Sequence, residues 1–132
     1  MLINYICPKC NGSLFVNDYI IFSTKVSQQK SGLILLHPEL GNYTVFSNPS
    51  FTISEGEQVD FFCPICHVKL ASEVNQNLAK IIMVDEHGVQ FRIYFSQIKG
   101  EQSTYQVVGE HVNVFGKHSE KYMDFLNLSN MR

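Results

Sequence analysis

The sequence lacks any long hydrophobic run, and this excludes a helix that crosses a membrane. Such a helix needs about 20 consecutive apolar residues, whereas runs such as Leu33–Leu36 have only the length of a strand. The residues before Cys7 also leave no room for the charged and then apolar pattern of a secretory signal. We therefore expect a cytoplasmic protein that makes no contact with a membrane.

Charge is also scarce and evenly mixed. Charged residues make up 17% of the chain, and ten basic and twelve acidic residues give a net charge of −2. A protein that binds nucleic acid usually gathers positive charge into a patch that neutralises phosphates. No run of five like charges occurs here, so the sequence argues against a nucleic-acid partner.

The common catalytic motifs are absent as well. The chain contains no glycine-rich phosphate loop, nucleophile elbow, His-Glu-x-x-His motif or kinase signature. We predict that the protein is not an enzyme.

What is present is the composition of one β-rich domain. A chain of 132 residues with 45% hydrophobic residues buries about two-thirds of its unfolded surface, and no linker divides it, so we expect one domain over 1–132. Runs rich in Val, Ile, Phe, Tyr and Thr are typical of strands. These runs predict strands at 2–6, 14–16, 19–26, 33–37, 43–46, 51–53, 59–62, 68–70, 78–84, 89–95, 104–108 and 112–115. The predicted fold is mainly β, with antiparallel sheets arranged as a meander or a sandwich.

The segment 78–115 has the clearest pattern. Apolar residues alternate with polar ones from Val89 to Phe95, which places one face of this strand in the core. Gly88 suits a tight turn before it, and Lys99-Gly100 suits a turn after it. We therefore predict an antiparallel meander over 78–115 with one packed face and one solvated face.

A short helix is predicted at 119–128. Tyr122, Phe125 and Leu126 have the spacing of an apolar stripe, and Ser119 is a suitable N-terminal cap. A helix of about ten residues is marginal alone, so we expect its stripe to pack on the sheet or on a partner.

The cysteines occur as two matched motifs. Cys7-Pro8-Lys9-Cys10 and Cys63-Pro64-Ile65-Cys66 each follow an apolar residue, and each has a leucine four positions after its second cysteine. This pattern predicts two strand–turn–strand knuckles, at 5–14 and 61–70. A left-handed residue is needed after the second cysteine, and Asn11 and Gly12 suit that need better than His67 does.

Two such knuckles can present four thiolates to one zinc ion at about 2.3 Å. In a reducing compartment, paired cysteines are more naturally metal ligands than disulfides, so Cys7, Cys10, Cys63 and Cys66 are predicted as a structural Zn²⁺ site. The 52 residues between the pairs exceed the roughly 15–20 of a compact ribbon. We interpret residues 15–60 as a β insertion. The zinc would then link the start of the chain to the middle of a larger β-structure.

At these motifs the chain resembles the zinc-ribbon and rubredoxin-like class of double-knuckle proteins. It is also similar to an uncharacterised bacterial domain family, the CpXC domain, which is named for its two Cys-Pro-x-Cys motifs. The resemblance covers Cys7–Gly12 and Cys63–Leu70, and it implies a four-thiolate metal site without a catalytic residue. Rubredoxins have glycine where this chain has His67, which makes iron the less favoured metal.

Three functions follow as hypotheses. The first is a non-catalytic zinc-binding β-domain that acts as a protein-interaction or regulatory module and recognises another protein or a second copy of the chain. Its best hints are Phe61-Phe62 and Tyr94-Phe95, because adjacent residues of a strand point to opposite faces. The second is a redox or electron-transfer protein that uses the cysteine pairs, and the third is a nucleic-acid-binding zinc ribbon. His67 is interpreted as orienting a ligand, and His111 and His118 as surface residues.

Overall fold

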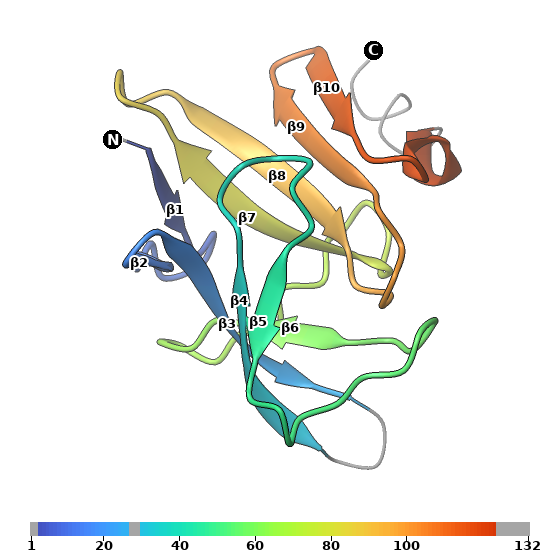
Figure 1. Ribbon diagram of the computed structural model, residues 1–132. Coiled ribbons are helices and arrows are strands. Elements are labelled where there is room, and N and C mark those ends of the chain that lie inside the picture. Colours follow the sequence, from blue (N-terminus) through green and yellow to red (C-terminus); the bar gives the residue numbers. More distant parts are fainter. Residues whose placement is uncertain (1–2, 27–29, 124–132) are drawn as a thin grey trace.

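The computed structural model describes residues 3–26 and 30–123, and this part of the chain is almost entirely β (Figure 1). Its strands are β1 (Asn4–Ile6), β2 (Phe15–Val16), β3 (Tyr19–Lys25), β4 (Ser31–Leu36), β5 (Val45–Ser47), β6 (Asp60–Phe62), β7 (Leu78–Val84), β8 (Gln90–Ser96), β9 (Thr104–Val108) and β10 (His111–Phe115). The predicted fold class, mainly β with antiparallel sheets, is confirmed.

The strands form two antiparallel sheets. One, called here the β7 sheet, has the order β1-β7-β8-β9-β10, and the other, the β3 sheet, has the order β2-β3-β4-β5 with β6 also paired to β3. Figure 1 shows the β7 sheet above and the β3 sheet below. Within the described residues, no helix is both long and apolar enough to span a membrane.

The main core lies between the facing sides of the two sheets. Phe22 of β3, Phe61 of β6 and Phe95 of β8 meet there, with ring centroids 5.1–5.5 Å apart. Phe61 meets both other rings edge to face, and such contacts add to the stabilisation that burial provides. The arrangement is therefore sandwich-like, which was one of the two predicted arrangements, a meander or a sandwich.

The two sheets repeat the same pairing pattern at a constant spacing. The β4–β5 pairs Ile34–Ser47 and Leu36–Val45 become the β8–β9 pairs Ile93–Gln106 and Phe95–Thr104 when 59 is added to each residue number. The same shift converts every β3–β4 pair into a β7–β8 pair. The turns also correspond, because Gly41 and Gly100 have φ angles of 90° and 89°. The β1 strand and the first knuckle correspond to β6 and the second knuckle with a shift of 56 instead. The fold therefore contains two structural repeats, the first over 4–47 and the second over 60–106.

The first strand of each repeat is exchanged with the other repeat. In the first repeat, β1 pairs with β7, while β6 of the second repeat pairs with β3. The registers match, because Ile6 lies opposite Ile82 and Phe62 lies opposite Ser23. Residues 15–60, interpreted above as an insertion, therefore contain the remaining strands of the first repeat and the start of the second.

Most predicted strands are present, and two are wrong. Residues 51–53 are a loop in which the Phe51 ring lies over Gly32 of β4, so close that a Cβ on Gly32 would be 2.8 Å from it. Residues 68–70 form only an isolated bridge from Lys69 to Phe62. The β7–β8 hairpin and the meander of 78–115 are confirmed, and Gly88 has the positive φ that its turn requires.

The expectation of a solvated outer face on the meander is wrong at its centre. Tyr94 points away from the main core, yet it is fully buried in a second cluster. That cluster consists of Leu78, Tyr94, Tyr105, Val107 and Tyr122. The outer face of the β7 sheet is therefore covered by the segment that follows β10.

The covering segment begins with a 3₁₀ turn, η2 (Ser119–Tyr122), where the helix of 119–128 was predicted. His118 takes the cap position with no side-chain cap hydrogen bond, so the predicted cap at Ser119 is wrong. Residues 124–128 of the predicted helix lie outside the described residues. Tyr122 packs on the sheet, as predicted for the apolar stripe, and its hydroxyl donates to Glu101 Oε1 at 2.5 Å.

Candidate metal centre

The first knuckle is a tight turn held by two backbone hydrogen bonds. The Cys7 amide donates to the Gly12 carbonyl at 3.0 Å, and the Asn11 amide donates to the Cys7 carbonyl at 2.9 Å. Asn11 is the left-handed residue, with φ 61°, and asparagine tolerates this region better than most residues. The prediction for this turn is confirmed.

The second knuckle has the same hydrogen bonds at equivalent positions. The Cys63 amide donates to Val68 at 3.0 Å, and the His67 amide donates to Cys63 at 2.9 Å. His67 has φ 68°. This residue therefore serves the turn through its backbone, in a conformation that is costlier for histidine than for glycine.

The two knuckles bring the four sulfur atoms together. Cys7 Sγ lies 3.8 Å from Cys66 Sγ, and Cys10 Sγ lies 3.8 Å from Cys63 Sγ. All four sulfurs lie within 4.8 Å of one another. Four ligands at about 2.3 Å from a tetrahedral zinc would be about 3.8 Å apart, whereas a disulfide needs about 2.05 Å. The cysteines are free thiols in the geometry of a metal site.

Backbone amides surround the sulfurs and favour negative charge on them. Lys9 and Cys10 amides lie 3.3 and 3.5 Å from Cys7 Sγ. The equivalent amides of Ile65 and Cys66 lie 3.3 and 3.4 Å from Cys63 Sγ. Because these donors are supplied by the turn itself, the Cys-Pro-x-Cys spacing arranges both the ligands and their hydrogen bonds.

Burial and hydrogen bonding shift the pKa of the two buried thiols, Cys7 and Cys63. Burial raises the pKa of Cys7 to about 12. Burial acts in the same direction on Cys63, but amide bonds from Cys66 and Ile65 and bonds with the neighbouring thiols outweigh it and lower its pKa. The pKa shifts of Cys7 and Cys63 therefore have opposite directions, although the two cysteines hold equivalent positions in their knuckles. A metal ion held by the four sulfurs would supply positive charge that favours their thiolate forms.

Each knuckle also connects the two sheets. The chain enters the first knuckle from β1 of the β7 sheet and leaves it for β2 of the β3 sheet. It enters the second from β6 of the β3 sheet, and it then pairs Ala71 with Ala79 of β7. The tetrad therefore joins both repeats where their strands are exchanged.

Ile65 is a residue of the site that sequence analysis missed. Its exposed side chain reaches from the second knuckle to the first, where a Cβ on Gly12 would lie 2.5 Å from Ile65 Cδ1 and 3.2 Å from Cys10 Sγ. Gly12 is thus needed for close approach rather than for a left-handed backbone. The sequence indicated only that Gly12 follows Asn11 in the knuckle. It could not indicate the contact with Ile65, because Ile65 lies 53 positions away from Gly12.

The histidines form no further cluster in the described part of the chain, where the only group of metal-ligating residues is the tetrad. His118 Nδ1 accepts the Gln102 amide at 2.9 Å, and His37 Nδ1 accepts the Glu39 amide at 3.0 Å. These two histidines therefore act in loop structure.

No protein-family model, curated protein or solved structure matches the chain. The resemblance to double-knuckle proteins consequently rests on the two motifs and on the sulfur geometry. That geometry is the ground for a functional proposal.

Proposed function

We propose that the protein is a non-catalytic, zinc-stabilised β-domain of the cytoplasm that recognises another protein. The observation that carries the metal assignment is the arrangement of four free sulfurs at the separations of a tetrahedral site. Four protein ligands fill the coordination of zinc and leave no position for an activated water. The metal's role is therefore structural.

The energetic reason is the position of the tetrad. Structural zinc sites contribute about 10–16 kcal/mol of apparent binding free energy, against about 5–15 kcal/mol for the stability of a whole domain. Here that energy would act between the exchanged strands β1 and β6, which pair over only three residues each. We infer that zinc holds the two repeats together.

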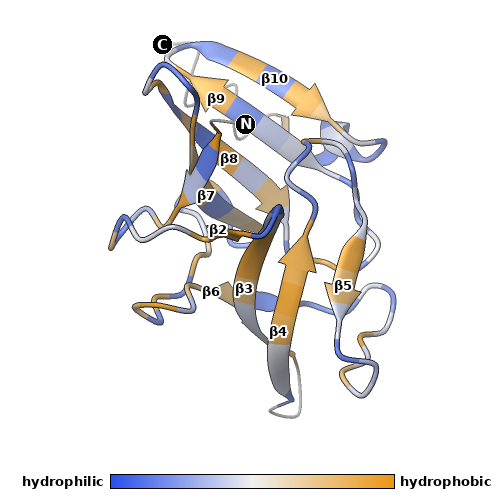
Figure 2. Ribbon diagram, turned by 60° about the vertical axis from the view of Figure 1, so that its left-hand side comes forward, coloured by the Kyte–Doolittle hydropathy of each residue, from blue (hydrophilic) through white to orange (hydrophobic). Residues whose placement is uncertain are grey.

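The protein-recognition proposal rests on the outer face of the β3 sheet, called here the bare face. Its central residues are Val16, Tyr19, Ile21, Leu33, Leu35 and Phe46. Val16, Leu33 and Phe46 are 54%, 56% and 47% exposed. Figure 2 shows the hydrophobic colouring of β3, β4 and β5. Contiguous exposed apolar surface of this kind marks interaction sites in soluble proteins.

The bare face can be compared, residue by residue, with the outer face of the β7 sheet, which belongs to the second repeat. Phe46 and Leu35 correspond to Tyr105 and Tyr94 of the second repeat, and both tyrosines are fully buried under the segment that contains Tyr122. The same position of the same architecture is thus covered on one sheet and open on the other. We propose that an apolar protein surface, from a partner or from a second copy, covers the bare face.

The redox alternative has one observation in its favour, since Cys10 and Cys66 are exposed. However, the shortest sulfur contacts join different knuckles rather than the two cysteines of one motif. A shared ion explains that arrangement better than two independent dithiols do. A red iron-thiolate absorption band, or reversible disulfides after mild oxidation, would favour the redox function.

Metal content tests the first half of the proposal. Protein purified without added metal should contain one zinc per chain by mass spectrometry, and its thiols should react only after chelation. Cys63→Ser should lose the metal, whereas the control His67→Ala should retain it. Equal zinc content in the wild type and Cys63→Ser would refute the four-cysteine site.

Substitution of the bare face tests the second half. Leu33→Glu and Phe46→Glu should abolish a protein interaction, or a self-association measured by sedimentation, that the wild type shows. The matched control is Val89→Glu, because Val89 is an exposed apolar residue that does not belong to the bare face. Identical sedimentation and partner binding for the wild type and Phe46→Glu would contradict the proposal.

A further inference from the structure

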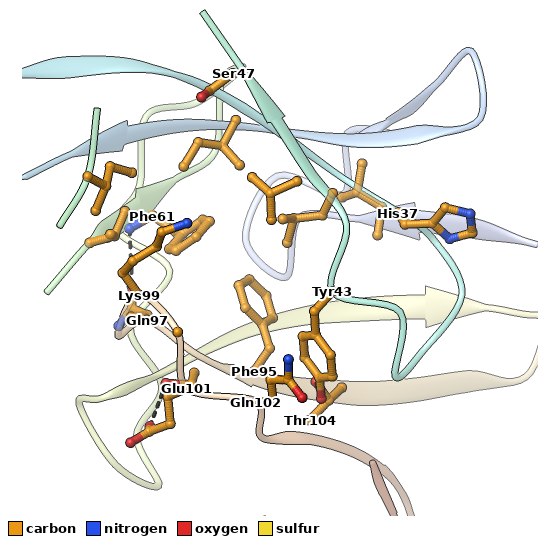
Figure 3. Close-up of a pocket in the computed structure, with 18 of the residues that line it drawn as sticks. His37, Tyr43, Ser47, Phe61, Phe95, Gln97, Lys99, Glu101, Gln102 and Thr104 are labelled. Atoms are coloured by element: carbon orange, nitrogen blue, oxygen red, sulfur yellow. Dashed lines mark hydrogen bonds between the residues drawn. The ribbon is translucent and has the colours of Figure 1, made fainter. Parts of the chain in front are cut away.

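A cavity of about 620 Å³ lies between the two sheets, away from the cysteines (Figure 3). Residues that correspond in the two repeats line its interior, including the pairs Ile34 and Ile93, and Leu36 and Phe95. Phe61 adds an aromatic ring to this interior. Cavities of about 300–1,000 Å³ with apolar walls and a few polar groups are typical binding sites for small molecules.

Two equivalent turns, 37–44 and 96–103, form part of the rim, but their side chains differ. Leu40 of the first turn packs against the core, whereas the corresponding residue of the second turn is Lys99. Tyr43 of the first turn corresponds in the same way to Gln102. The two turns therefore have equivalent backbones, but only the second turn carries a lysine, Lys99.

Most polar groups of the rim are already engaged. The Glu101 carboxylate accepts bonds from Ser96 and Tyr122 and pairs with Lys121 at 2.7 Å. The Tyr43 hydroxyl bonds to Thr104 at 2.8 Å. These groups fix the shape of the rim and have little capacity left for a ligand.

Lys99 differs from them. Within the described part of the chain, its ammonium has no ion pair or hydrogen-bond partner. Figure 3 shows its side chain among those that line the cavity, on the same side as Phe61. A lysine stem can lie along apolar surface while its charge remains available to a ligand.

From these observations we propose that the cavity binds a small amphipathic organic monoanion. Its apolar body occupies the space between Ile34, Ile93 and Phe95, and its carboxylate pairs with Lys99. One negative charge is the most that Lys99 can neutralise, because Glu39 and Glu55 also line the cavity at exposed positions and oppose any further negative charge. The site is independent of the metal centre and of the bare face.

Titration calorimetry with two probes of equal length tests the proposal. Sodium decanoate should bind the intact protein once per chain, and more tightly than 1-decanol does. Lys99→Met should lower the affinity for decanoate about fivefold, as expected for a solvent-accessible ion pair, and leave the affinity for decanol unchanged. Lys25→Met is the matched control, because Lys25 is exposed and does not line the cavity.

A second variant tests the location of the apolar body. Val45 lines the cavity from the edge strand β5 and is 44% exposed, so Val45→Trp should narrow the cavity without unfolding the protein. Both probes should then bind at least fivefold more weakly, with zinc content and circular dichroism unchanged. Unchanged binding of both probes to this variant would place them elsewhere. No binding of decanoate to the wild type, or equal affinities of the wild type and Lys99→Met for decanoate, would overturn the proposal.

Discussion

The two repeats have the same strand pairing but opposite surroundings on their outer faces. Tyr105 of the second repeat is 0% exposed, whereas Phe46 at the corresponding position of the first repeat is 47% exposed. The difference comes from the segment after β10, because Tyr122 of this segment packs in the cluster on the outer face of the β7 sheet. It teaches that the same strand pairing can carry a covered outer face or an exposed one, because the side chains at corresponding positions differ.

The largest expected effect tests whether the two knuckles are equivalent. Cys7→Ser and Cys63→Ser should each remove the metal and lower the free energy of unfolding by several kcal/mol, because the four ligands act as one unit. Metal analysis together with urea denaturation measures both losses. Loss of metal in one variant and full retention in the other would break the equivalence.

The outer faces are compared by truncating corresponding aromatic residues. Tyr105→Ala should cost about 3–5 kcal/mol, because it empties a buried site, and Phe46→Ala should cost less than about 1 kcal/mol in the isolated chain. Urea denaturation gives both values. Similar costs would mean that the bare face is covered in solution, and a concentration-dependent midpoint would identify a second copy as the cover.

A smaller effect is expected at the contact between the knuckles. Gly12→Ala should destabilise the protein by about 1–2 kcal/mol, because its Cβ would displace the exposed Ile65 side chain and crowd Cys10 Sγ. The double variant Gly12→Ala, Ile65→Ala should recover part of that loss. Ile65→Ala alone is the control, because it removes the same side chain without adding a Cβ at Gly12. A double variant less stable than Gly12→Ala would contradict the contact.

The left-handed residues of the knuckles should differ by a smaller amount. His67→Gly should stabilise the protein by about 1 kcal/mol, because glycine adopts φ 68° without the Cβ clash. Asn11→Gly should be closer to neutral, since asparagine tolerates this region. Thermal unfolding of the zinc-bound protein measures both changes. A loss of zinc in His67→Gly would instead assign the imidazole to the metal site.

The smallest expected effect concerns the covering segment and depends on pH. Burial opposes ionisation of Glu101, but hydrogen bonds from Lys121, Ser96 and Tyr122 outweigh it and hold its pKa below the ordinary value. A carboxyl with a lowered folded-state pKa contributes stability above its unfolded pKa of about 4.3, and that contribution is lost as the pH falls through the folded-state pKa.

Glu101→Gln should therefore lower stability by less than about 1 kcal/mol at pH 7 and by a smaller amount at pH 3. Denaturation curves of the variant and the wild type at the two pH values test this. The corresponding residue of the first repeat, Asn42, has no carboxylate, so the control Asn42→Gln should change stability by the same amount at both pH values. A deficit for Glu101→Gln that grows as the pH falls would contradict the assigned sign.

Much of the local structure was predictable because it depends on neighbouring residues. The two motifs predicted both knuckles and the four cysteines, and Gly88 marked the turn between β7 and β8. The repeat beyond the motifs was not predictable from residue identities. For example, Ile21 corresponds to Lys80 and Leu33 to Arg92 in the strand pairing, so related positions share a backbone register without sharing side-chain chemistry.

The sequence by itself determined the β class of the fold, the knuckle turns and the set of four cysteines. These features follow from strand propensity, from turn conformation and from the short spacing of two ligands on one turn. Only the tertiary structure decided that β1 and β6 exchange between the repeats, that Tyr122 covers one outer face, and that a cavity with Lys99 on its rim lies between the sheets. The physical reason is that these features depend on contacts between residues far apart in the chain, whose pairing is selected by the packing of the whole core rather than by any local pattern.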